Sequence, residues 1–166
     1  MDEGAARDAV LGLYAEGVVA VADLAERAEW AREACGSWTA VEVVRHLAAV
    51  AGWYHAWLDR AEAGEVQAPF PPDELPRHNA EELLVRVEQD PGDAVVEYVE
   101  QANRYADRLP DAWDRPYGFP LGTVTAGHHA AVAVAEWHLQ AWDLARVSAT
   151  DHRPSDQGLL MRAAGR

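Results

Sequence analysis

The residues best suited to chemistry are one histidine and a polar pair far downstream in the chain. His46 lies in the middle of an apolar helical pattern, between Val43 and Val50. Glu136 and Gln140 are four residues apart, so on a helix they project the same way, about 6 Å apart along the axis. Helical bundles build metal sites from such a pair together with a histidine of a facing helix. The three residues therefore form a candidate metal site.

Each of these residues also has a plainer interpretation. A lone histidine on an apolar face is more often a core residue with a buried partner than a ligand. The pair of Glu136 and Gln140 also fits a solvated edge of its helix. Asp143 continues the same stripe at three-residue spacing. The sequence leaves both interpretations open.

The remaining histidines and the cysteine carry weaker signals. We expect surface or structural roles for His55, His128, His129 and His138. Neighbouring residues of a helix point about 100° apart, so the adjacent histidines cannot easily share one ion. His138 projects away from the polar stripe and could stack on Trp142. Cys35 lies between two helical segments with no evident base nearby in sequence, which favours a structural thiol over a nucleophile.

Long amphipathic segments must position these residues. Apolar residues at three- and four-residue spacing predict helices over residues 4–28, 39–63, 79–109 and 121–148, with a short fifth helix over 155–164. Thr39 and Glu42 form a capping-box pattern at the start of the second helix, and Gly64 is a natural stop. At Asp90, either the third helix kinks or a new helix begins with Pro91 in its first turn.

Two proline-containing connections complete the predicted layout. Residues 68–76 form a long proline-rich loop, after which Asn79 is expected to cap the third helix with Glu82. Residues 110–120 form a second loop, and no segment alternates convincingly like a strand. We therefore predict an all-α four-helix bundle in a single domain over residues 1–166, whose last dozen or so residues are a tail or short helix.

Composition narrows the function classes. The chain has a formal net charge of −14, and this acidic balance argues against nucleic-acid binding. Its 14 basic residues are all Arg. A single cysteine cannot form an internal disulfide, which favours a reducing compartment. The acidic N-terminus does not resemble a signal peptide, and no apolar run approaches the ~20 residues of a membrane span. We expect a cytoplasmic protein without a membrane or nucleic-acid partner; its Trp-bearing faces leave a homodimer open.

Two motifs resemble a known family. The first reads Ser37-Trp38-Thr39-Ala40, followed by the segment from Glu42 to Leu47, which contains His46. The second runs from Glu136 to Ala145 and contains Gln140 and Asp143-Leu144. Their order and their spacing of 90 residues between His46 and Glu136 resemble the DinB-like superfamily, and more narrowly its mycothiol-dependent maleylpyruvate isomerase branch.

The resemblance implies a DinB-like four-helix bundle with a divalent metal of the zinc or nickel class. His46 and Glu136 match two metal ligands of the family, and Asp143 matches a residue that supports them. Gln140 stands where the family has a histidine, and a carboxamide is a poor replacement for imidazole at such a site. The implied activity is isomerisation or S-transfer on a small electrophile, using a thiol such as mycothiol. The alternative is a degenerate, non-catalytic binding or structural bundle that has lost its metal through Gln140.

Overall fold

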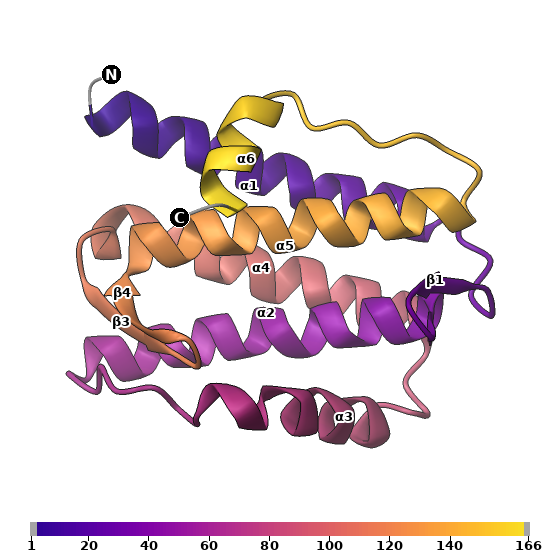
Figure 1. Cartoon of the computed structure of the whole chain (residues 1–166), viewed down its shortest axis with the longest axis horizontal. Coiled ribbons are helices and arrows are strands. Elements are labelled where there is room, and N and C mark those ends of the chain that lie inside the picture. The colour runs from indigo at the N-terminus through magenta and orange to yellow at the C-terminus, as the bar shows by residue number, and fades with distance from the viewer. Residues whose placement is uncertain (1–2, 165–166) are drawn as a thin grey trace. The chain divides into compact units, whose positions relative to one another are not determined.

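The computed structural model describes residues 3–164 and is mostly helical (Figure 1). It comprises two compact units, one formed by the residues up to 43 together with those from 127 on, the other by residues 44–126. The expectation of a predominantly helical chain is therefore confirmed, whereas the four-helix bundle and the single domain over residues 1–166 stay predictions. Within the described range, no helix combines the length and apolar character needed to cross a membrane.

The first unit is built on two long helices, α1 (Glu3–Ala25) and α5 (Ala126–Val147), which lie side by side (Figure 1). Tyr14 packs edge-on against Trp137, with ring centroids 5.9 Å apart. Gly17 permits the close approach, since a Cβ there would lie 2.8 Å from the Cβ of Trp137. An apolar seam along α5 is buried, at Ala130, Val134, Trp137, Ala141 and Leu144.

A small β-hairpin follows α1 in the same unit. Strands β1 (Glu33–Cys35) and β2 (Trp38–Thr39) pair antiparallel across a turn in which Gly36 has a φ of 57°. The cysteine thus lies in a strand, which corrects the expectation of a chain without strands. At the start of the next helix, the Thr39 backbone N–H and hydroxyl both donate to one carboxylate oxygen of Glu42, each at 2.7 Å. The carboxylate half of the predicted capping box is confirmed.

The second unit contains most of α2 (Ala40–Glu62) and all of α4 (Pro91–Ala112), which lie side by side. The rings of Tyr54 and Tyr105 are 5.9 Å apart, and the Arg108 guanidinium bonds the Asp59 carboxylate at 2.7 Å. Gly64, with a φ of 86°, follows the end of α2 as the sequence predicted. The end of α2 is therefore set locally, whereas aromatic packing and ion pairs join it to α4.

The segment between α2 and α4 differs from its prediction. A short 3₁₀ turn, η1 (Pro72–Glu74), runs directly into α3 (Leu75–Val85), and no side chain caps α3. The expected cap by Asn79 is therefore wrong, because Pro76 fits the first turn of a helix and allows an earlier start. The alternative of a new helix at Asp90 is confirmed: its carboxylate accepts from the backbone N–H of Gly92 at 2.8 Å and of Asp93 at 3.4 Å.

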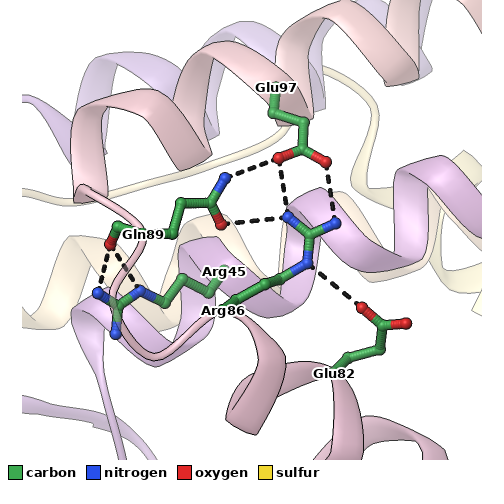
Figure 2. Close-up of polar contacts among 5 residues, drawn as sticks. All are labelled: Arg45, Glu82, Arg86, Gln89 and Glu97. Atoms are coloured by element: carbon green, nitrogen blue, oxygen red, sulfur yellow. Dashed lines mark hydrogen bonds and ion pairs between the residues drawn. The ribbon is translucent and has the colours of Figure 1, made fainter.

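A polar network ties the end of α3 to α2 and α4 (Figure 2). The Arg86 guanidinium donates to both carboxylate oxygens of Glu97, at 2.8 and 2.9 Å, and also reaches Glu82 at 3.3 Å. The side-chain amide of Gln89 donates to the same Glu97 at 2.7 Å, while its backbone carbonyl accepts from Arg45 of α2. These bonds lower the pKa of Glu97, Arg86 being the main cause. The network fixes the turn between α3 and α4.

A second hairpin replaces the predicted loop before α5. Strands β3 (Pro116–Phe119) and β4 (Gly122–Thr125) pair antiparallel, so the last long helix begins at Ala126 rather than near Leu121. The preceding α4 also extends past Pro110, which the sequence had placed in the loop. The error has a physical reason, since the three consecutive β-branched residues in Gly-Thr-Val-Thr favour a strand that is too short to recognise by period alone.

Candidate functional site

The predicted polar stripe lies on α5, in the first unit. Glu136, Gln140 and Asp143 are all half-buried. The Gln140 side-chain amide donates to a Glu136 carboxylate oxygen at 3.3 Å. The amide oxygen of Gln140 is buried and accepts no hydrogen bond within the described part of the chain. An unsatisfied buried acceptor costs about 1–3 kcal/mol, so this oxygen is poised to receive a donor or a cation.

Cys35 lies beside this stripe, which sequence reasoning missed. Burial, a hydrogen bond to the Asp143 carboxylate and the negative charges of Asp143 and Glu136 raise the pKa of the Cys35 thiol to about 11. Arg146, 3.9 Å from Asp143, opposes this shift only weakly. The thiol is therefore protonated near neutral pH, which favours the structural interpretation over a nucleophile. No local signal links these residues, because the β1–β2 hairpin brings the cysteine to α5.

This arrangement predicts how Cys35 reacts with an alkylating reagent. Asp143→Asn removes one of the charges that favour the protonated thiol, so iodoacetamide at pH 8 should modify Cys35 faster than in the parent, by up to about tenfold. Each unit by which the pKa falls multiplies the thiolate fraction by about ten. Mass spectrometry of timed samples measures the rate. Asp151→Asn, at an exposed carboxylate paired with Arg153, is the matched control and should leave it unchanged.

His46 lies on α2, where its side chain is only 6% exposed. This burial agrees with its predicted place on the apolar face of the helix. His46 belongs to the second unit, whereas Glu136 and Gln140 belong to the first. The grouping of all three residues into one metal site therefore stays a prediction, as does the supporting role of Asp143.

The side chains of the stripe include possible metal ligands. Among residues 3–164, no three His, Cys, Asp or Glu side chains gather closely enough to hold an ion. At the stripe, the carboxamide of Gln140 lies beside the Glu136 carboxylate. Its oxygen is buried and has no hydrogen bond among the described residues, so it is an available oxygen donor.

His138 takes a place that the sequence did not predict. Its side chain is 2% exposed, its Nε2 bonds the backbone oxygen of Leu13 at 2.9 Å, and its Nδ1 faces Nε2 of His152 at 3.0 Å. The structural interpretation of His138 fits this burial, but the suggested stacking on Trp142 is wrong. Trp142 is 52% exposed and instead carries the Arg146 guanidinium over its ring, 5.3 Å from the centroid.

The two tryptophans of α2 pack within the second unit. Trp53 and Trp57 stack with centroids 5.9 Å apart, and each also meets Phe70 edge-on at 6.1 Å. The ring of His78 stacks on Phe70 at 4.0 Å. This packing places both Trp rings in an aromatic cluster of the second unit.

Comparison of the chain with protein-family models, with curated proteins and with solved structures found no match in any of the three.

Proposed function

We propose that the chain is a DinB-like four-helix bundle that holds a divalent metal through His46, Glu136 and Gln140. The proposed activity is isomerisation or S-transfer on a small electrophile with a low-molecular-weight thiol, mycothiol being the thiol of the resembled branch. A bound divalent ion would supply the lowered pKa that makes such a thiol a nucleophile at neutral pH. The proposed setting is the cytoplasm.

One observation carries this proposal, the buried carboxamide oxygen of Gln140 beside the Glu136 carboxylate. It leaves an oxygen donor without a hydrogen bond at the position that the resembled motif assigns to a ligand. Asp143 already accepts from the Cys35 thiol, so in this scheme it shapes the negative surroundings of the site rather than binding the ion. Because carboxamide oxygen is a weaker ligand than imidazole for zinc or nickel, we expect modest affinity.

The test is metal uptake by the whole chain. Protein freed of metal by a chelator is titrated with zinc and with nickel in a calorimeter. We expect one ion per chain at this site, and its binding is lost in Glu136→Ala and in His46→Ala. His55→Ala is the matched control on α2, since His55 bonds Arg108 and not the proposed ligands. Absence of any uptake that depends on Glu136 and His46 contradicts the proposal.

The degenerate alternative also has an observation in its favour. The Gln140 amide donates to Glu136 at 3.3 Å, so the two side chains already satisfy part of each other's bonding capacity. In a bundle without a metal, this pair would be a structural contact of α5.

Gln140→His discriminates between the two functions. If the metal was lost through Gln140, this variant should gain tight zinc binding that the parent lacks, because imidazole restores a nitrogen ligand. Gln140→Asn keeps the carboxamide but shortens its reach and serves as the control. Equal zinc affinity in the parent and in Gln140→His contradicts the degenerate alternative.

A further inference from the structure

The strongest unassigned feature is the pair of His138 on α5 and His152 in the segment that follows it. Nδ1 of His138 lies 3.0 Å from Nε2 of His152. The ring planes are only 15° apart while the centroids are 5.2 Å apart. The centroid separation exceeds the nitrogen separation by about the width of one ring, so the rings meet edge to edge, nitrogen to nitrogen, rather than face to face.

The hydrogen bonds fix the tautomer of His138. A carbonyl oxygen only accepts, so Nε2 of His138 must donate to the backbone oxygen of Leu13, at 2.9 Å. In the neutral ring, Nδ1 then carries a bare lone pair, and it is aimed at His152. A metal-binding histidine in a protein usually donates its other N–H to a carbonyl or carboxylate in this way.

Packing holds His138 in place. The side chain is 2% exposed, and its ring lies against Gly17 of α1, where an added Cβ would approach Cδ2 and Nε2 to 3.3 Å. His152 is half-buried and lies outside the helices, between α5 and α6 (Gln157–Ala164). One nitrogen is therefore fixed, while the other belongs to a segment that can adjust.

The surroundings of the pair are acidic. Glu16 of α1 and Asp151 both act electrostatically on His152. The Glu16 carboxylate also accepts from the Ser155 backbone N–H at 2.7 Å and from the Ser155 hydroxyl. Asp151 is paired with Arg153 at 2.9 Å. A doubly positive ion at the histidine pair would thus be favoured by two nearby carboxylates.

The geometry points to a second, separate metal site, in which His138 and His152 bind a zinc-class ion. Two nitrogens about 2.0–2.1 Å from a tetrahedral zinc are about 3.3 Å apart, so the pair needs to open by only a few tenths of an ångström. The His152 ring tilts until both lone pairs converge, and its proton moves from Nε2 to Nδ1. Water fills the remaining positions.

Such an ion would join the segment after α5 to the pair of helices α1 and α5. Figure 1 shows this segment returning from the end of α5 to α6, which lies near α1. At present, the histidine pair and the Ser155–Glu16 bonds hold it there. Metal binding would make this attachment stronger without using any residue of the site proposed above.

Zinc titration of the whole chain at pH 7.5 tests the inference. We expect His152→Ala to weaken this binding at least about tenfold, whereas Glu136→Ala and His46→Ala retain it. His152 is the residue to change, because its half-buried position outside the helices makes misfolding of the variant a small concern. Long-range proton–nitrogen NMR of the imidazoles supplies a second readout, in which zinc should shift Nδ1 of His138 and Nε2 of His152.

The outcomes separate this inference from the proposed function. Equal zinc binding by the parent and His152→Ala, or no imidazole shift at these two nitrogens, overturns the histidine-pair site. A parent that binds a single ion, with this binding kept in Glu136→Ala and lost in His152→Ala, supports the pair and contradicts the proposed function. With both sites present, the parent binds two ions, and each single variant binds one.

Discussion

Gly118→Ala is expected to destabilise the unit of residues 44–126 by about 3 kcal/mol or more. A Cβ on Gly118 would lie 2.5 Å from the backbone oxygens of both Val66 and Gln67. Backbone atoms cannot rotate aside as a side chain can, so the segment must move away from the β3–β4 hairpin. That movement also strains the bond from the Thr123 hydroxyl to the Val66 oxygen, now 2.8 Å. Urea unfolding followed by circular dichroism measures the loss.

Gly52→Ala is the matched control in the same unit. Gly52 lies inside α2, and a Cβ there meets nothing within 4 Å. Alanine should therefore stabilise the helix, by up to about 1 kcal/mol, through its higher helix propensity. If Gly118→Ala loses less than about 0.5 kcal/mol while Gly52→Ala behaves as expected, the contact of Gly118 with residues 66–67 is not the constraint that we describe.

Acid is expected to destabilise the chain through His129. Complete burial, and to a lesser extent the neighbouring His128, lower the pKa of His129 to about 3. The unfolded chain takes up this proton near pH 6.5, so between pH 6.5 and 3 the unfolded state binds more protons than the folded state. The stability from a neutral His129 is thus complete above pH 6.5 and falls by about 1.4 kcal/mol for each pH unit below it.

His129→Gln isolates this effect, because glutamine does not titrate. Urea unfolding of the parent and the variant at several pH values between 4.5 and 8 gives two stability profiles. Acidic groups titrate in both proteins, so their contributions cancel in the difference between the two stability profiles. We expect the parent to lose about 2–3 kcal/mol more than the variant between pH 6.5 and 4.5. Parallel profiles would show that His129 takes up its proton without unfolding.

The helices followed from local spacing. Apolar residues at three- and four-residue intervals predicted the helices that form α1, α2 and α5, although α5 begins later than expected. The cap at Asp90 and the stop at Gly64 set boundaries through bonds and backbone angles of a few neighbouring residues. Such signals are contained in the sequence because they act within one or two helical turns.

Local spacing did not predict the two hairpins or the early start of α3. Strands of two to four residues are too short for a period to emerge. The β3–β4 hairpin is held by Tyr117, which donates to the Tyr54 backbone oxygen at 3.1 Å, and by the close contact of Gly118 with residues 66–67. These contacts join segments far apart in the chain, so no local sequence pattern predicts them.

The sequence by itself determined which residues could do chemistry and which helices carry them. It placed Glu136, Gln140 and Asp143 on one stripe of α5 and His46 on the apolar face of α2, because helical geometry follows directly from spacing. Only the tertiary structure decided what these side chains meet. It set Cys35 against Asp143 and His152 against His138, because those encounters depend on how separate elements pack.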